Sequence, residues 1–214
     1  HRQGRGKGSM ALRESGLGRA YYRRLEAWVL PLVERTGLSP SGLSLLGVLA
    51  AALVPAAFWL HPFAGVVCML VSGVLDNLDG LLSRARSSTG PYGEFLDSTL
   101  DRIADVFFLT GFWVLLWGVT DLAVFGTLLV LGCLAVTLLV GYTKERIESL
   151  GVTCTGGIFG RPERVILLLV LGSAVGVFPG QAERILFLGL GAYLVLGVLT
   201  LGQRFRLAGQ KLKK

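Results

Sequence analysis

Five aspartates between residues 76 and 105 have the types and spacing of groups that could share one site. Asp76 and Asp79 lie three positions apart and Asp97 and Asp101 lie four apart, so each pair falls on one face of a helix. Asp105 follows one turn later. Four converging carboxylates would repel one another, and all-oxygen ligands of this kind suit Mg²⁺ or Mn²⁺. The spacing therefore predicts a site for divalent cations formed by the first four aspartates.

Two such cations about 4 Å apart would form a clamp for phosphoryl transfer, one acting on the phosphate and the other holding the leaving oxygens. Gly80 and Gly93 would let a bulky group approach the backbone of the two helices. Arg84 would neutralise a diphosphate by a bidentate contact. We therefore expect a phosphotransferase.

Three other interpretations stay open at this point. The acids could flank helix ends in a solvated link, or they could belong to a non-catalytic membrane scaffold. A divalent-cation transporter is the third interpretation, but it would need acids near the middle of several helices, and the other apolar segments have none there.

Composition indicates an integral membrane protein. Of the 214 residues, 52% are hydrophobic and 16% are charged, against about 25% charged in soluble domains. A bilayer core requires about 20 apolar residues in a helix. Six stretches meet that requirement: 41–60, 63–85, 93–118, 121–143, 162–178 and 183–203. We expect an all-α polytopic bundle of six transmembrane helices, in which a charge deep in the bilayer costs at least ~2.5–3.5 kcal/mol and therefore indicates function.

The flanking regions have a different character. Residues 1–9 look like a tag or a disordered leader, without the apolar region of a signal peptide. Over residues 10–38, apolar residues recur at helical spacing among basic ones, which predicts an interfacial amphipathic helix. A soluble helix packed on the bundle is the alternative. The six-helix domain would then cover 39–205, with a basic tail over 206–214.

The net charge of +7 follows from lysines and arginines gathered in alternate links between the apolar stretches. By the positive-inside rule, this pattern puts both termini and the acidic site in the cytoplasm, in a multi-pass protein of the cell membrane. The basic residues form no stripe interleaved with aromatics, so nucleic acid is excluded as a partner. Three cysteines form no disulfide framework, and Cys68 and Cys133 are expected in the core.

The stretch from Asp76 to Asp101 resembles the signature of the CDP-alcohol phosphatidyltransferase family, D-x2-D-G-x2-A-R-x8-G-x3-D-x3-D. Every spacing fits, and one identity departs, since Ser83 stands where the family has alanine. The six-span arrangement also looks like class I of this family, and the resemblance covers nearly the whole chain after residue 15. It implies an enzyme of phospholipid biosynthesis that moves a phosphatidyl group from a CDP-linked lipid to an alcohol and releases CMP.

The resemblance also implies roles for individual residues. Asp76, Asp79 and Asp97 would bind two metal ions, and Asp101 would complete the site and act as general base on the acceptor hydroxyl. The nucleotide and diphosphate pocket would be lined by Asp79, Gly80, Ser83, Arg84 and Gly93.

A second, basic cluster bears on the acceptor. Arg161 and Arg164 stand at an expected helix start, which favours anions, and Lys144 and Arg204 come from other helices that should converge there. Such a pocket would suit a phosphorylated acceptor, although the positive-inside rule alone would also explain these cations. Lys144 and the segment from Arg161 to Arg164 are similar to elements of phosphatidylinositol-phosphate synthases. That resemblance implies inositol phosphate as acceptor and favours a homodimer; glycerol 3-phosphate is a rival, and serine ranks third.

Overall fold

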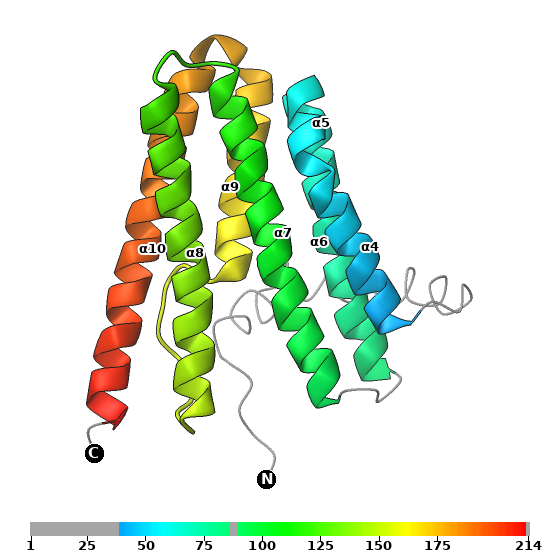
Figure 1. The fold of residues 1–214 in the computed structure, drawn as a ribbon, viewed down its shortest axis with the longest axis vertical. Coiled ribbons are helices and arrows are strands. Elements are labelled where there is room, and N and C mark those ends of the chain that lie inside the picture. Colours follow the sequence, from blue (N-terminus) through cyan, green and yellow to red (C-terminus); the bar gives the residue numbers. More distant parts are fainter. Residues whose placement is uncertain (1–38, 86–89, 213–214) are drawn as a thin grey trace.

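The computed structural model describes residues 39–85 and 90–212, and this part of the chain is all-helical (Figure 1). The helices are α4 (Pro40–Ala52), α5 (Val54–Leu60), α6 (Pro62–Ala85), α7 (Pro91–Trp117), α8 (Ala123–Ser149), α9 (Arg161–Val177) and α10 (Ala182–Leu212), with the short 3-10 helix η2 (Pro179–Gln181) before α10. The predicted leader at 1–9 and interfacial helix at 10–38 lie outside the described residues. The predicted basic tail begins as helix, because α10 continues to Leu212.

Prolines set where several helices begin and where one of them breaks. Pro40, Pro62 and Pro91 occupy helix starts, where the missing N–H has no partner to lose. Pro55 instead falls inside the first expected span and cannot donate a hydrogen bond to the preceding turn. The helix therefore ends at Ala52 and resumes at Val54, so the stretch predicted at 41–60 consists of two helices.

Four helical segments of the described chain are long and apolar enough to cross a bilayer: Pro40–Leu60, Pro62–Ser83, Ala123–Ser149 and Pro179–Leu212. Large apolar side chains such as Leu128 and Leu188 stand exposed on their outer faces, as a lipid-facing surface requires. Of the other two predicted spans, α7 carries charged residues as far as Asp105, and α9 has 17 residues. The described residues thus confirm an all-α bundle that contains helices long and apolar enough to cross a membrane.

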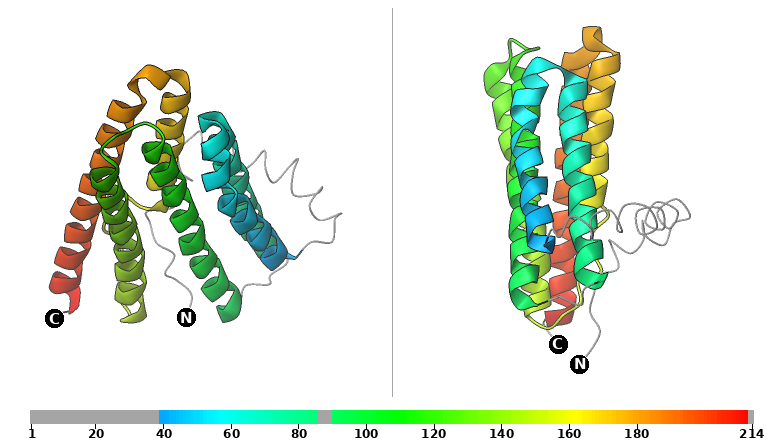
Figure 2. Two further views of the ribbon diagram at one scale, coloured as in Figure 1. Left: turned by 45° about the horizontal axis from the view of Figure 1, so that its top comes forward. Right: turned by 90° about the vertical axis from the view of Figure 1, so that its right-hand side faces the viewer.

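The arrangement of the helices brings the end of α6 and the start of α7 to the same end of the bundle (Figures 1 and 2). The helix α4 packs along both of them, whereas α6 and α7 touch each other only over a short stretch. On the other side, α8 packs against α7 and α10, and α9 packs against α6 and α10. The acid-bearing parts of α6 and α7 are therefore neighbours whose relative position is set mainly by α4 and α5.

Phe58 lies in the core, where glycines of three helices let them approach its ring. The side chain is 3% exposed, and its ring meets that of Phe112 edge-on, with centroids 5.1 Å apart. Gly65 of α6, Gly111 of α7 and Gly172 of α9 all lie against this ring. A Cβ atom at Gly172 would lie 3.3 Å from Phe58 Cζ. The close packing of α5 with these helices thus depends on missing side chains.

Replacing Gly111 with alanine is expected to lower the free energy of unfolding, because the added Cβ would lie 2.7 Å from both Val54 Cγ1 and Phe58 Cδ2. Overpacking of this kind costs about 1–3 kcal/mol. Thermal unfolding of the purified protein in detergent measures the loss. The matched control is Gly73→Ala in α6, where an added Cβ meets nothing within 4 Å. If the two variants unfold at the same temperature, the packing around Phe58 is not what limits stability.

Candidate active site

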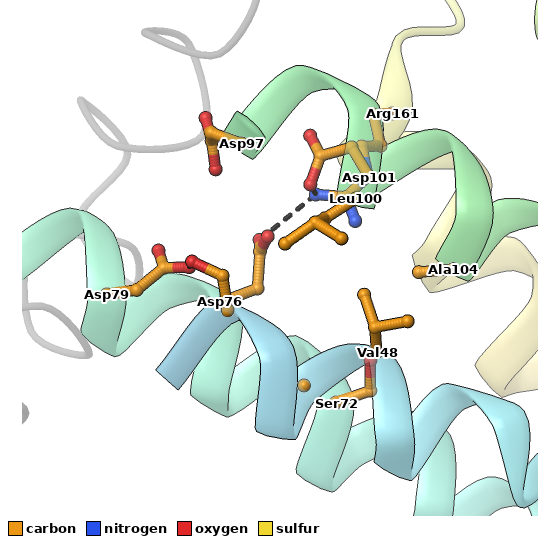
Figure 3. A pocket seen from close by; sticks show the side chains of 11 residues that line it. Val48, Ser72, Asp76, Asp79, Asp97, Leu100, Asp101, Ala104 and Arg161 are labelled. Atoms are coloured by element: carbon orange, nitrogen blue, oxygen red, sulfur yellow. Dashed lines mark hydrogen bonds and ion pairs between the residues drawn. The ribbon is translucent and has the colours of Figure 1, made fainter. Parts of the chain in front are cut away.

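Carboxylates of α6 and α7 meet where α6 ends and α7 begins. Asp76 of α6 and Asp97 and Asp101 of α7 offer oxygen atoms that all lie within 4.8 Å of one another. Figure 3 shows these three side chains pointing toward a common space, with Asp97 at its exposed side. The convergence predicted from their spacing is therefore present. Three carboxylate donors so close together fit a hard divalent cation such as Mg²⁺ or Mn²⁺.

The acids line a pocket of about 250 Å³, a volume that includes space open to solvent. Residues of α4, α6, α7 and the first residue of α9 form its walls. The apolar part of the lining is provided by Val48, Leu100 and Ala104, of which Figure 3 shows Leu100 next to Asp76 and Asp101. The acidic cluster is thus the polar side of a hollow between helices rather than a group of separate surface acids.

Asp79 lines the same pocket but is tied to α4. Its side chain is buried, and its Oδ2 accepts a hydrogen bond of 2.5 Å from the hydroxyl of Ser44. Hydrogen bonds from a hydroxyl to a charged carboxylate are short and strong. The helix α4, which contributes no acid, therefore fixes the orientation of one of the four predicted ligands.

Arg161, the first residue of α9, places its guanidinium among these carboxylates. Its Nη1 lies 2.7 Å from Asp101 Oδ1 and 3.0 Å from Asp76 Oδ2, and the pair with Asp76 is drawn in Figure 3. Its Nε lies 3.6 Å from Asp105 Oδ1. Of the residues predicted to hold the acceptor's phosphate, Arg161 is therefore the one that joins the basic cluster to the acidic one.

Arg164 lies one turn further along α9 and is buried with Asp105. Its Nη2 donates a hydrogen bond of 3.1 Å to Asp105 Oδ2, and its Nη1 contacts the carbonyl oxygen of Thr137 in α8 at 3.5 Å. Breaking a buried pair of this kind is costly, because it leaves one charge uncompensated. The Nε atoms of Arg161 and Arg164 are buried and have no hydrogen-bond partner among the described residues. The Nε of Arg161 faces Asp105 Oδ1 at 3.6 Å without a hydrogen bond, so Asp105 lies between the two guanidinium groups.

The segment between α8 and α9 is hydrogen-bonded to α10, and this contact positions the start of α9. The N–H of Phe159 donates a hydrogen bond of 3.1 Å to Thr200 Oγ1. Gly157 has a φ of +114°, and a Cβ there would lie 2.7 Å from Thr200 Cγ2. Only glycine combines this backbone conformation with this close approach. Gly157 therefore lets the chain run against α10 just before Arg161.

Arg204 of α10 also holds the segment between α8 and α9. It is buried, its Nε donates to the carbonyl oxygen of Gly156 at 3.2 Å, and its Nη1 donates to the carbonyl oxygen of Val140. Since Arg164 contacts the carbonyl of residue 137, both arginines reach the same turn of α8. Lys144, half-buried, follows one turn later on that helix. The four predicted phosphate ligands thus come from three helices that are in contact.

The remaining predicted pocket residues lie along the facing ends of α6 and α7. Gly80 and Ser83 are half-buried in the last turns of α6. Gly93 is exposed in the first turn of α7, and a Cβ there would meet nothing within 4 Å. The side chain of Arg84 is outside the described part of the chain. Of these positions, Gly93 therefore has open space around its Cα within the described part of the chain.

Sequence reasoning gave no role to two residues that the structure ties to the site. Ser44 precedes Asp79 by 35 positions, so no local spacing could connect them. Asp105 did carry a signal, because it is an acid one turn beyond Asp101, at the point where the apolar part of the helix begins. Arg102 points elsewhere, since it pairs with Glu145 of α8 at 2.5 Å.

Comparison with known proteins identifies close relatives of this chain. The family described as CDP-alcohol phosphatidyltransferase matches residues 38–199. The archaetidylinositol phosphate synthase of Methanothermobacter thermautotrophicus is 32% identical over 192 residues, which cover 88% of this chain and 92% of that protein. The phosphatidylinositol phosphate synthase of Mycobacterium marinum is 33% identical over 195 residues, covering 88% and 81%.

Solved structures agree with these sequence matches. The crystal structure of Mycobacterium tuberculosis phosphatidylinositol phosphate synthase with CDP-DAG bound has a TM-score of 0.67 and 26% identity, and the match covers 83% of this chain and 92% of that one. The same enzyme in complex with manganese and citrate also has a TM-score of 0.67 at 26% identity, with 83% and 87% covered. Sequence profile, relatives and fold agree over most of the chain, and the acidic motif lies inside the matched region. This multi-pass membrane protein therefore belongs to the CDP-alcohol phosphatidyltransferase family.

Proposed function

We propose that this transferase moves a phosphatidyl group from CDP-diacylglycerol to inositol phosphate and releases CMP. Its family establishes the general reaction, a CDP-alcohol phosphatidyltransfer. The observation that carries the choice of acceptor is the contact between the two clusters, because Arg161 lies within ion-pair distance of Asp76 and Asp101. The site for the diphosphate of the donor and the site for the phosphate of the acceptor would therefore be adjacent, with Arg161 between them.

On the donor side, we propose that Asp76, Asp79, Asp97 and Asp101 hold two Mg²⁺ or Mn²⁺ ions. The first, third and fourth of these already offer oxygens within 4.8 Å of one another. Ions bound there would supply Lewis-acid stabilisation of the phosphate and of the leaving oxygens. The proposed nucleotide and diphosphate pocket consists of Asp79, Gly80, Ser83, Arg84 and Gly93. The related enzyme of Mycobacterium tuberculosis was solved once with manganese and citrate and once with CDP-DAG, which supports a divalent cation and a CDP-linked lipid as ligands of this site.

Asp101 is the proposed general base. Its carboxylate would take the proton from the acceptor hydroxyl while that oxygen attacks the phosphorus on the lipid side of the diphosphate. The new P–O bond forms as the bond to CMP breaks, and CMP leaves with the electron pair. The 2.7 Å contact between Asp101 and Arg161 supports this role, because a phosphate held by Arg161 would bring its hydroxyl-bearing ring near the base.

For the acceptor, we propose that Lys144, Arg161, Arg164 and Arg204 bind its phosphate. The partly exposed guanidinium of Arg161 supports this assignment, since guanidinium donors match phosphate oxygens. Relatives that act as inositol phosphate synthases support the choice of inositol phosphate. Glycerol 3-phosphate offers the same phosphate, and serine offers none.

We also propose the setting of this reaction. Six membrane spans over residues 39–205, with an interfacial helix over 10–38 and a basic tail over 206–214, would place both termini and the acids on the cytoplasmic side of the cell membrane. The gathering of lysine and arginine at that end supports this orientation. A homodimer is the assembly we propose, with the bilayer and the CDP-linked lipid as the other partners.

The acceptor assignment predicts which alcohol releases CMP. Purified protein is mixed with CDP-diacylglycerol and Mn²⁺, and CMP is measured with inositol phosphate, glycerol 3-phosphate or serine. Release is expected to be fastest with inositol phosphate and absent with serine, because serine leaves the basic cluster without an anion to bind. Faster release with glycerol 3-phosphate would replace our acceptor with that rival. Failure with all three would reject the proposed function.

The base assignment predicts that Asp101→Asn lowers kcat by about 10²–10⁴-fold, the usual contribution of a general base. CMP release under saturating substrates gives kcat, and binding of CDP-diacylglycerol, measured separately, is expected to stay near that of the wild type. The matched control is Glu94→Gln, which removes the same charge from an exposed position on α7. A variant at position 101 that kept kcat within tenfold would exclude Asp101 as the base.

The phosphate-site assignment predicts a separation of KM values. Lys144→Gln is expected to raise the KM for inositol phosphate about 10–100-fold, because a charged donor to the phosphate contributes about 1.5–3 kcal/mol. The KM for CDP-diacylglycerol is expected to stay unchanged. Arg146→Gln, two residues along the same helix and exposed, controls for the loss of one positive charge. If the two variants have the same KM for inositol phosphate, Lys144 does not bind the phosphate of the acceptor.

A further inference from the structure

We propose that Arg161 and a divalent cation compete for Asp76 and Asp101, and that cation binding frees the Arg161 guanidinium for the phosphate of the acceptor. This inference rests on the proposed function, since it concerns the same acids and the same basic cluster. It assigns to one residue the coupling between the two halves of the site.

The competition follows from the atoms that Arg161 contacts. A single nitrogen, Nη1, lies 2.7 Å from Asp101 Oδ1 and 3.0 Å from Asp76 Oδ2. These two carboxylates belong to the group of three whose oxygens lie within 4.8 Å of one another and would hold the cation. A guanidinium and a divalent cation on the same carboxylates would repel each other at short range. Binding of either positive group therefore weakens binding of the other.

Exposure and contacts show which of the two arginines can move. The side chain of Arg161 is 26% exposed, whereas that of Arg164 is 5% exposed. Arg164 is held by Asp105 and by a carbonyl of α8, so its guanidinium is fixed in the interior. Arg161 is the first residue of α9. Its Nε lies near Asp105 and has no hydrogen-bond partner among the described residues. Asp105 would thus keep Arg161 near Arg164 once Nη1 leaves the other acids.

Thermodynamic linkage then gives a prediction in both directions. If the cation releases Arg161 to an oxyanion, then the oxyanion, by drawing Arg161 away from the acids, must tighten cation binding by the same factor. The acceptor's phosphate would consequently be bound best after the metal site is filled. Arg161 would therefore favour an order in which metal and donor bind before the acceptor.

Binding of Mn²⁺ to the purified chain in nanodiscs, without CDP-lipid, tests this inference without any turnover. Free Mn²⁺ is measured by electron paramagnetic resonance, with and without sulfate as a tetrahedral oxyanion. We expect Arg161→Gln to lower the Kd for Mn²⁺ about tenfold, and sulfate to lower the wild-type Kd about fivefold but not that of the variant. Arg161→Lys keeps the charge and is expected to bind Mn²⁺ nearly as the wild type does. Arg206→Gln, at an exposed position of α10, controls for net charge.

The outcomes separate this inference from the function on which it rests. If the wild type binds Mn²⁺ and loses it in Asp97→Asn, but Arg161→Gln keeps the wild-type Kd, the competition is refuted and the metal site stands. An equal tightening in Arg206→Gln also refutes it, because the effect would then be one of net charge. If the wild type shows no Mn²⁺ binding that depends on Asp97, the proposed function falls, and this inference falls with it.

Discussion

Repulsion between like charges is the constraint on which this structure depends. Helix packing holds Asp76, Asp97 and Asp101 with oxygens within 4.8 Å of one another. Two unit charges 4 Å apart interact by about 4 kcal/mol at the effective dielectric of a protein surface, so three such groups need a positive partner. Arg161 provides it in this structure. The acids and the basic cluster are therefore parts of one electrostatic unit, although they lie on different helices.

The helices that carry no catalytic group set the geometry of this unit. Phe58, approached by glycines of α6, α7 and α9, sets how closely these helices pack. Ser44 of α4 orients Asp79, and Thr200 of α10 holds the segment that leads into Arg161. The reactive side chains thus lie on rigid helices whose positions are determined by contacts some distance away, which is the arrangement that precise site geometry requires.

Much of the fold and the acidic site could be predicted from the sequence, because the signals are local. Apolar stretches and prolines at helix starts locate the helices, and the three- and four-residue spacings put the aspartates on common faces. A link of a few residues then brings Asp76 and Asp101 together. The contacts of Ser44 with Asp79 and of Arg161 with Asp76 span 35 and 85 positions, so they depend on tertiary packing that no local pattern contains. Pro55 indicates a break in the helix of the first span, but hydropathy averaged over 20 residues does not detect it, because the residues on both sides are apolar.

The buried pair of Asp105 and Arg164 has a consequence for how the protein is made. Arg164 follows Asp105 by 59 positions, so α7 emerges from the ribosome before the group that neutralises it. A buried acid without its partner is costly, because one charge is left uncompensated. Final packing of α7 is therefore coupled to the arrival of α9, and a chain truncated before α9 would leave Asp105 without the arginine that neutralises it.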